Sequence, residues 1–457
     1  MSDIVLGKEQ LEAIKTLTRF INTEDTTITM SGAAGTGKTV LINEFIKILQ
    51  SKRKLFVLAA PTHKAKLVME MATGCQASTI HQLLSLQPNL ELFELDFRDL
   101  VFLTTSQDKP NMIPYRGFVI IDEASMINDE LFDFIVQKCK ESKCKIVFVG
   151  DSKQLQPVKS DSISKVFLLP NVITLTKIYR QKEESPVLDL LSILRDKPLN
   201  TFNSFKGKED SINVYHNVTD FLKSSKDDLI KSVNNRDILN TRILAYTNER
   251  VSGYNIACRK LIFNDGYTCP YHLNEILTGC ENFEFDGYKF YNSLDYIITE
   301  PPVLETCLIP YVEIPLNGYR LHLWEPIYKT EQEVFIVRQD INNLSDINNV
   351  LNYMENVRLQ AVTLKSMGKR TGKLWTAYYA INSSFATSFN GYFNNRIIKK
   401  KTFDYGYALT VHRSQGSGFN SVYVDMNNIN LCSDENVVRQ LQYVAVSRTR
   451  GDATLLI

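Results

Sequence analysis

The sequence predicts an α/β protein with two parallel-sheet units, each interrupted by an insertion. In the first part of the chain, short apolar segments run into small or polar loops at residues 26–30, 55–60, 118–121 and 145–149. A helical pattern follows Thr39, where apolar residues recur on one face. Similar apolar segments lie at residues 242–246, 421–426 and 453–457. Strand, loop and helix in repeated order are typical of a parallel sheet covered on both faces.

Composition changes along the chain mark the predicted units. With 457 residues, the chain is too long for a single hydrophobic core. We expect the first sheet unit at residues 1–84 and 117–177, with a hairpin insertion at 85–116. The second sheet unit is expected at residues 178–260 and 403–457, around an insertion at 261–402. This larger insertion is rich in Tyr, Phe and Asn and has short alternating segments, which predict mostly β structure with some helix.

The bulk properties exclude several classes of protein. Hydrophobic residues make up 44% of the chain and charged residues 23%, as in ordinary globular proteins. The sequence contains neither a long apolar segment nor a secretion signal. We therefore expect a cytoplasmic protein that does not associate with a membrane. The eight cysteines form no CxxC pair, so no zinc site is expected. A net charge of +1 does not indicate a nucleic-acid partner, so the evidence for such a partner must come from motifs.

A phosphate-binding loop follows the first predicted strand. Residues 32–39 (GAAGTGKT) match GxxxxGK[ST] at every fixed position. Glycines allow backbone N–H groups to surround phosphates, and the helix that follows presents its positive end. Lys38 would reach the β- and γ-phosphates of ATP, and Thr39 would hold Mg²⁺. Gly35, Thr36 and Gly37 complete the predicted nucleotide contacts.

Two acids supply the second half of a nucleotide hydrolase. The apolar segment 118–121 runs directly into Asp122 and Glu123. Asp122 would hold Mg²⁺ at the sheet edge, and Glu123 would orient and deprotonate the attacking water. These two elements predict an NTPase without identifying what it acts on.

Eight further segments, in order, resemble motifs of superfamily-one helicases of the 5′→3′ branch, which includes RecD-like and Dda-like enzymes. They lie at residues 6–10, 60–66, 78–81, 150–158, 175–181, 245–248, 407–417 and 443–450. The resemblance implies two RecA-like motor domains. It also implies that residues 85–116 form a strand-separating pin and that residues 261–402 form an SH3-like accessory domain.

The resemblance also assigns nucleotide contacts. Gln10 would bond adenine, Gln154 would sense the γ-phosphate, and Gly416 would lie at the nucleotide. Arg180 and Arg448 lie on the second sheet unit, whereas Lys38 lies on the first. If both arginines reach the γ-phosphate across a cleft, ATP closes that cleft and hydrolysis reopens it. For each arginine, the alternative is a surface salt bridge.

The same resemblance implies single-stranded DNA contacts that mix hydroxyl, imidazole and amide groups suited to phosphates. These contacts are Pro61, Thr62, His63, Lys64, Thr79, His81, Thr410, His412, Ser414 and Gln415. The three histidines could instead be packed in the core. Aromatic residues such as Trp375 could stack bases, but are more often core. Phe97 is expected as the wedge of the pin, with Phe93 and Phe102 as alternatives, unless these rings only pack the hairpin.

The resulting hypothesis is a monomeric ATP-dependent 5′→3′ DNA helicase that acts on single-stranded DNA and its junctions with duplex. A single-strand-binding protein or a replisome component could be its partner. A translocase that mainly displaces bound proteins would share every motor residue. An RNA motor of the same superfamily is also compatible with these motifs. A regulatory nucleotide switch would instead hydrolyse ATP regardless of DNA.

Overall fold

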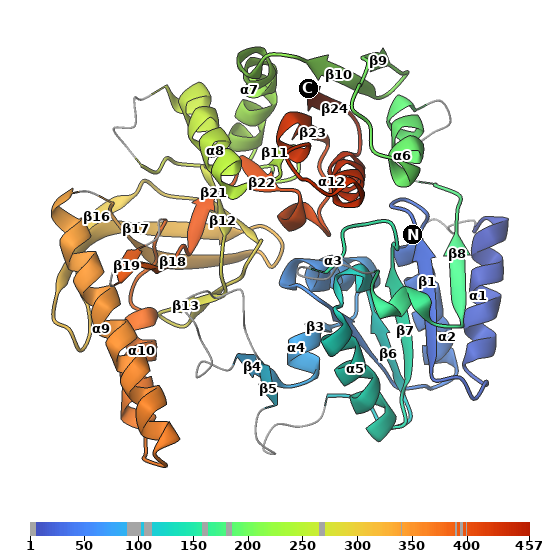
Figure 1. Cartoon of the computed structure of the whole chain (residues 1–457), viewed down its shortest axis with the longest axis horizontal. Helices are drawn as coiled ribbons and strands as arrows, with labels where there is room; N and C mark the ends of the chain where they lie inside the picture. The colour runs from blue at the N-terminus through green and yellow to red at the C-terminus, as the bar shows by residue number, and fades with distance from the viewer. Residues whose placement is uncertain are drawn as a thin grey trace.

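The computed structural model describes residues 6–88, 102–104, 112–157, 163–179, 185–264, 270–339, 341–388, 391–393, 396–398 and 400–457. Figure 1 shows three bodies in contact: a blue to teal sheet unit, a green and red sheet unit above it, and a yellow to orange insertion beside both. Phe93, Phe97 and Arg180 lie outside the described residues.

The first sheet is parallel throughout, with strand order β3-β2-β6-β7-β1-β8. Four of its strands are the apolar segments predicted from the sequence. Phe45 and Phe118 pack on one face of the sheet, and Phe132 and Phe148 on the other. The elements of this unit are α1 (Lys8–Phe20), β1 (Thr27–Gly32), α2 (Lys38–Ser51), β2 (Phe56–Ala60), α3 (His63–Thr73), β3 (Ala77–Thr79), α4 (Ile80–Leu83), β6 (Phe118–Ile121), α5 (Asp129–Glu141), β7 (Lys145–Gly150) and β8 (Val172–Leu175).

A short antiparallel pair occupies the predicted hairpin insertion. β4 (Leu86–Pro88) pairs with β5 (Phe102–Thr104) directly after α4. Two short antiparallel strands therefore lie within residues 85–116, where the hairpin insertion is expected.

The second sheet has strand order β22-β11-β23-β24-β10-β9, parallel except for β9 at one edge. The predicted segments at 242–246, 421–426 and 453–457 form β11, β23 and β24. The elements of this unit are α6 (Pro186–Asp196), β9 (Phe205–Lys206), β10 (Ser211–Tyr215), α7 (Val218–Asn234), β11 (Thr241–Ala245), α8 (Asn248–Phe263), β22 (Ala408–Thr410), β23 (Ser421–Asp425), α11 (Met426–Ile429), α12 (Glu435–Ser447) and β24 (Ala453–Leu456).

The insertion combines an antiparallel sheet with two helices. Its sheet has the order β16-β17-β15-β12-β21, with β18 also paired to β17. The elements are β12 (Ile276–Gly279), β13 (Phe283–Phe285), β14 (Tyr288–Phe290), β15 (Asp295–Ile298), β16 (Val303–Leu308), β17 (Pro315–Glu325), β18 (Thr330–Val337), α9 (Ile341–Ser366), α10 (Gly372–Asn382), β19 (Gly391–Phe393), β20 (Arg396–Ile398) and β21 (Phe403–Tyr405).

Two features of the insertion differ from the sequence-based prediction. Residues 403–405 were expected in the second sheet unit, but they form β21 and pair with β12. The chain therefore completes the insertion sheet before it re-enters the second sheet at β22. Helix α9 is 26 residues long and, with α10, forms the arm at the left of Figure 1. Helix is thus a larger part of this unit than expected.

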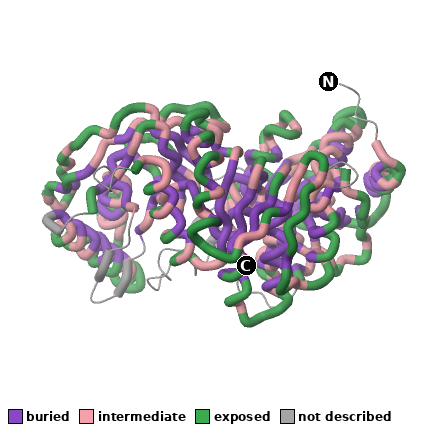
Figure 2. The backbone as a smooth tube through the Cα atoms, turned by 90° about the horizontal axis from the view of Figure 1, so that it is seen from above, coloured by how far each residue is buried: buried purple, intermediate pink, exposed green. Residues whose placement is uncertain are grey.

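Buried residues are concentrated inside the two masses seen in Figure 2, and exposed residues lie mainly on their outer rims. Each of the three large sheets is associated with at least one apolar cluster. Among the helices that the structure describes, none combines the length and the apolar character that a membrane span requires.

Candidate nucleotide site and nucleic-acid interface

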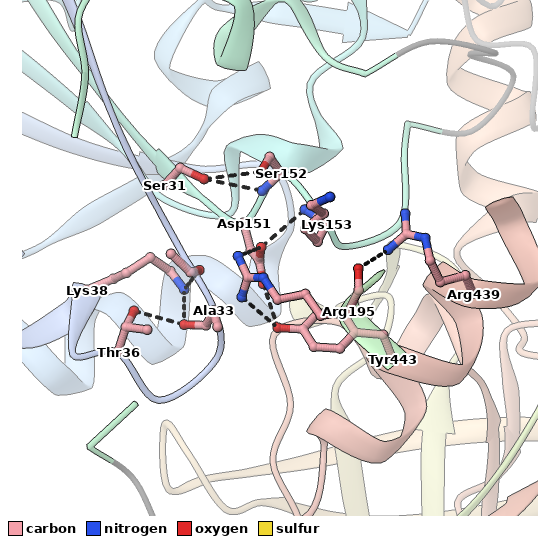
Figure 3. A network of polar contacts seen from close by, with 11 residues as sticks. Ser31, Ala33, Thr36, Lys38, Asp151, Ser152, Lys153, Arg195, Arg439 and Tyr443 are labelled. Atoms are coloured by element: carbon pink, nitrogen blue, oxygen red, sulfur yellow. Dashed lines mark hydrogen bonds and ion pairs between the residues drawn. The ribbon is translucent and has the colours of Figure 1, made fainter. Parts of the chain in front are cut away.

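The loop between β1 and α2 has the geometry of a phosphate cradle. Gly35 and Gly37 adopt left-handed φ values of 84° and 86°, which glycine tolerates best. Helix α2 begins at Lys38, so its positive end faces the loop. Lys38 Nζ donates to the carbonyls of Gly32 at 2.8 Å and Ala33 at 3.0 Å (Figure 3). The ammonium group is therefore folded over the loop where phosphates would bind.

Gln10 lies against this loop. It is buried on α1, where its Oε1 accepts from Gly7 N–H at 3.0 Å and its Nε2 donates to the Thr36 carbonyl at 3.0 Å. The segment after β8 also reaches the loop, because Tyr179 N–H donates to the Gly35 carbonyl at 2.7 Å. The structure thus places the predicted adenine contact beside the predicted phosphate contact.

The two predicted acids follow β6 at the same sheet edge. Burial, together with the charge of Glu123, raises the pKa of Asp122 to about 6, and the Lys38 ammonium opposes this rise. Glu123 has a left-handed φ of 50°, a conformation that is costly for a residue with a side chain and is common at functional sites. Thr39 lies on the first turn of α2 and is half-buried. Hydroxyl and carboxylate oxygens are the donors that Mg²⁺ prefers, so Thr39 and Asp122 fit that ion.

Arg448 of the second sheet unit lies near one of these acids, Glu123. It caps the C-terminus of α12 and is only 4% exposed. Its guanidinium group donates to the carbonyls of Val444 at 3.1 Å and Ser417 at 3.3 Å, and to Ser447 Oγ at 2.9 Å. Burial lowers the pKa of Arg448, and the charge of Glu123 acts in the opposite direction. A buried cation from one sheet unit therefore lies within electrostatic reach of an acid from the other.

A network of polar contacts joins the two sheet units (Figure 3), and two of its members, Tyr443 and Asp151, lie near Arg448. Asp151, at the end of β7, is fully buried. Tyr443 of α12 donates its hydroxyl to Asp151 Oδ2 at 2.8 Å, and Arg195 of α6 donates to Asp151 Oδ1 at 3.3 Å. Tyr443 and Asp151 lie in motif-like segments, but no motif identified Arg195. Sequence reasoning missed this connection because it brings together residues that are 44 and 292 positions apart in the chain.

Gln154 lies three residues beyond Asp151 and is buried. Within the described part of the chain, its Oε1 has no hydrogen-bond partner. An unsatisfied buried acceptor is costly, and such groups often have a functional role. The structure thus leaves this side chain available for the predicted nucleotide-sensing contact.

The predicted DNA contacts of the first sheet unit cluster at the starts of α3 and α4. Thr62 and Thr79 cap these helices, accepting from Ala65 N–H at 3.1 Å and Gln82 N–H at 3.2 Å. Pro61 and His81, beside them, are half-buried, and burial lowers the pKa of His81. Both helix starts lie at the carboxyl ends of adjacent strands, β2 and β3, which brings these residues to one edge of the sheet.

His63 is packed against an aromatic side chain of the insertion. Its ring centroid lies 4.2 Å from that of Tyr291, and within the described residues its buried Nδ1 has no hydrogen-bond partner. Burial lowers its pKa to about 4, with smaller contributions from Lys66 and His81. His63 is therefore neutral near pH 7 and could contact nucleic acid by stacking or by a neutral hydrogen bond.

Lys64 does not occupy the position that we expected. We predicted a DNA contact, but its side chain is buried and lies 3.8 Å from Asp295 of the insertion. Asp295 also accepts from Arg242 of the second sheet unit at 2.9 Å. His63 and Lys64 both lie on the first turn of α3 and both contact the insertion, but Lys64 is the one drawn to its buried carboxylate. In this conformation its role is an ion pair between units.

The predicted contacts of the second sheet unit lie in and after β22. Thr410 Oγ1 accepts from Arg413 N–H at 3.3 Å, and the Ser414 hydroxyl is used internally, donating to the Val411 carbonyl at 2.7 Å. Burial lowers the pKa of His412. Gln415 has a buried Nε2 that lacks a hydrogen-bond partner in the described structure.

Gly416 connects this segment to the first sheet unit. It has a left-handed φ of 72°, and a Cβ atom built on it would lie 3.7 Å from the Ala65 side chain. The loop after β22 therefore packs against α3, so the DNA contacts predicted on the two sheet units lie next to one another. We expected Gly416 at the nucleotide, but its nearest neighbour across the interface is α3.

Comparison with known proteins agrees with this arrangement. The first part of the chain, residues 5–210, matches a family model described as an AAA domain, and residues 405–456 match the UvrD-like helicase C-terminal domain. The chain is 25% identical over 469 residues to the ATP-dependent DNA helicase Dda of Enterobacteria phage T4, with 98% of both chains covered. These matches are consistent with the resemblance to superfamily-one helicases of the Dda-like kind.

Two further matches also cover nearly the whole chain. An uncharacterised protein of Acanthamoeba polyphaga mimivirus is 26% identical, with 98% of both chains covered. The crystal structure of the Pif1 helicase from Candida albicans superposes with a TM-score of 0.52 at 18% identity, covering 99% of this chain and 94% of that one. The fold, with its two parallel sheets, is therefore shared with that structure along nearly the whole chain.

Proposed function

We propose that the chain is an ATP-driven motor that moves 5′→3′ along single-stranded DNA and separates duplex. The observation that carries the proposal is the interface at α12. There, Arg448 of the second sheet unit is buried within electrostatic reach of Glu123 of the first. A nucleotide bound between Lys38 and Arg448 would be shared by both units, so its hydrolysis would change their relative position.

Each residue at this interface has a defined task in the proposed reaction. Gln10 would bind adenine, and Gly35, Thr36, Gly37 and Lys38 would hold the phosphates. Thr39 and Asp122 would hold Mg²⁺, which neutralises phosphate charge when bound. Glu123 would take a proton from the attacking water, and Gln154 would orient the γ-phosphate. Arg448, with Arg180, would stabilise the charge that develops on the transferred group.

Single-stranded DNA would cross the edge where α3 and the loop after β22 meet. Pro61, Thr62 and His63 lie on one side of that contact, and Thr410 and His412 lie on the other. Thr79, His81, Ser414 and Gln415 extend the two groups. Lys64 is omitted from this track because its ammonium group pairs with Asp295. The mixture of short polar groups suits a backbone that is followed without reading its sequence.

The β4–β5 hairpin would separate the strands at a junction of single-stranded and duplex DNA. We propose Phe97, in the segment between these strands, as the wedge that stacks on the last base pair. If this is correct, Phe97→Ala leaves DNA-stimulated ATP hydrolysis intact and lowers the number of base pairs opened per ATP. Unchanged opening per ATP would reassign the ring to packing of the hairpin.

The function is tested by measuring ATP hydrolysis with and without oligo-dT, and then unwinding of duplexes that carry a 5′ or a 3′ single-stranded tail. The proposal expects DNA-stimulated hydrolysis and opening of the 5′-tailed substrate. Hydrolysis that ignores DNA would indicate a nucleotide switch, and opening of only the 3′-tailed substrate would overturn the polarity. Displacement of streptavidin without strand separation would identify a translocase. A matched oligo-U substrate separates DNA from RNA as the track.

A further inference from the structure

We infer that Tyr443 is a positioning residue that fixes the loop carrying Gln154 and thereby makes the γ-phosphate contact depend on the second sheet unit. This inference rests on the function proposed above. Its basis is that residues 151–156 belong to the first sheet unit, where Ser152 bonds Ser31 of β1, but are also held on both sides of Gln154 by side chains of the second.

The Tyr443 hydroxyl lies between two parts of the nucleotide site. It donates to Asp151 Oδ2 at 2.8 Å, and the backbone of Ala34 in the phosphate loop lies near it. Tyr443 is 2% exposed, and Asp151 is fully buried. A hydrogen bond to a buried carboxylate is stronger than one between neutral groups. A single hydroxyl of α12 therefore bonds the start of the segment that carries Gln154 at a point beside the phosphate loop.

Arg195 completes the grip on Asp151. Its guanidinium group donates to Oδ1 of Asp151 at 3.3 Å and to the Tyr443 hydroxyl at 3.4 Å. The guanidinium lies 5.9 Å from the centre of the Tyr443 ring, and Arg439 donates to the Arg195 carbonyl at 2.8 Å. Helices α6 and α12 thus present Arg195 and Tyr443 to Asp151 as one unit (Figure 3).

The far end of the loop is held by the same helices. Leu155 is 2% exposed and belongs to the apolar cluster of the second sheet unit, with Leu191 of α6 and Leu441 of α12. Gln156 N–H, in addition, donates to Gln440 Oε1 of α12 at 3.4 Å. Gln154 lies between these two attachments. Its position therefore follows the second sheet unit, although its chain neighbours belong to the first.

Arg448 caps the C-terminus of α12, five residues after Tyr443. A movement of α12 relative to the first sheet would displace Arg448 directly and Gln154 through Asp151 and Leu155. Two groups assigned to the γ-phosphate would therefore move together. The expected consequence is that loss of the Tyr443 hydroxyl impairs the hydrolytic step more than nucleotide binding.

The test uses Tyr443→Phe in the full chain, with kcat and KM for ATP measured at saturating oligo-dT. The expected kcat is lower by a factor of about 10 to 100, the loss typical of one hydrogen bond to a charged group, with KM changed less than about twofold. Tyr423→Phe is the matched control. Tyr423 is also a buried tyrosine of the second sheet unit bonded to a carboxylate, Asp228 at 3.1 Å, but it faces α7. Its removal should leave both constants unchanged.

A second measurement distinguishes positioning from general packing. In a Gln154→Ala background, the Tyr443→Phe change should lower kcat by less than about twofold, because residues that act through one another are not additive. Additive losses, a change in KM alone, or equal effects of the two tyrosine variants would overturn the inference. If Tyr443→Phe fails to fold, Arg195→Met provides the same comparison.

A failure of the positioning role of Tyr443 can be distinguished from a failure of the proposed function. Wild-type hydrolysis that is indifferent to oligo-dT would refute the motor, and the Tyr443 comparison could still be made on the basal rate. A DNA-stimulated wild type with an unaffected Tyr443→Phe variant would refute only the positioning role.

Discussion

Asp295 offers the sharpest test of how the three units are joined. Its carboxylate accepts from Arg242 of the second sheet unit at 2.9 Å and lies 3.8 Å from Lys64 of the first. The side chains of Asp295 and Arg242 are 1% exposed, and that of Lys64 is 7% exposed. One buried anion therefore balances two buried cations that belong to different units.

The change Asp295→Asn keeps the shape and removes the charge. Lys64 can respond by losing its proton, because burial already lowers its pKa. Arg242 cannot respond in this way, since a guanidinium remains charged. Removing one partner of a buried ion pair costs about 3 to 5 kcal/mol, so the insertion should be less stable by roughly that amount. The change Lys64→Met removes a buried cation and leaves the shorter Arg242 contact intact, so we expect less than about 1 kcal/mol.

Both tryptophans of the chain, Trp324 and Trp375, lie in the insertion. Their fluorescence during urea unfolding therefore reports on this unit. With a typical urea dependence of about 1 to 3 kcal/mol per molar, Asp295→Asn should lower the midpoint by at least about 1 M. The double variant Asp295→Asn with Arg242→Met should recover much of this loss. A midpoint unchanged by Asp295→Asn, or a loss in Lys64→Met as large as in Asp295→Asn, would refute the reasoning.

The acid dependence of this contribution has a definite sign. Burial alone would raise the pKa of Asp295, but Arg242 and Lys64 lower it below its ordinary value of 3.8. A carboxyl group whose folded-state pKa is depressed contributes stability above its unfolded pKa. That contribution is lost as the pH falls through the folded value. The difference between wild type and Asp295→Asn should therefore be constant near pH 7 and disappear only below about pH 4.

Three further predictions concern the nucleotide and DNA sites. Arg448→Ala should retain nucleotide binding and lower ATP turnover by about 10³ or more, and normal turnover would contradict the shared-nucleotide model. The pKa of Asp122 is about 6, so this carboxyl becomes protonated between pH 7 and 5 and competes with Mg²⁺ binding. The Mg²⁺ concentration needed for half-maximal turnover should therefore rise on the order of 10-fold over this range. An unchanged requirement would show that Asp122 does not hold the ion. His63→Ala should weaken oligo-dT binding on the order of 10-fold without changing how the binding constant depends on salt concentration, because a histidine whose pKa is about 4 is neutral. A weaker salt dependence in the variant would instead indicate a charged contact with phosphate.

The regular elements of both motor sheets could be predicted from the sequence. Residues 118–121 and 145–149 are continuous apolar segments because both faces of a parallel sheet are covered. The phosphate loop could also be predicted from the sequence, because its glycines and Lys38 act through local backbone geometry. Helix α9 could have been recognised from Ile347, Val350, Leu351 and Met354, which are buried at helical spacing. The many polar residues between them obscured that period.

Contacts between units could not be predicted in the same way. Lys64 sits within a segment that resembles a DNA-contacting motif, and only its position opposite Asp295 shows that it is buried. Arg195 lies on an ordinary amphipathic helix and gains its role from a carboxylate 44 residues earlier. Local patterns determine strands and loops, whereas such partners depend on how separate units pack.

The two buried carboxylates explain why these packing contacts bear on the proposed motion. Asp151 ties the first sheet unit to α6 and α12, and Asp295 ties the insertion to both sheet units. If Asp151 follows α6 and α12 when the sheets move, a contact must lengthen at Asp295, because that carboxylate lies against both sheet units. At Asp295, the contact with Lys64 is already 3.8 Å, whereas the one with Arg242 is 2.9 Å. Since electrostatic attraction falls with distance, the Lys64 contact is the cheaper one to lengthen. The insertion should therefore follow the second sheet unit when the two sheets separate.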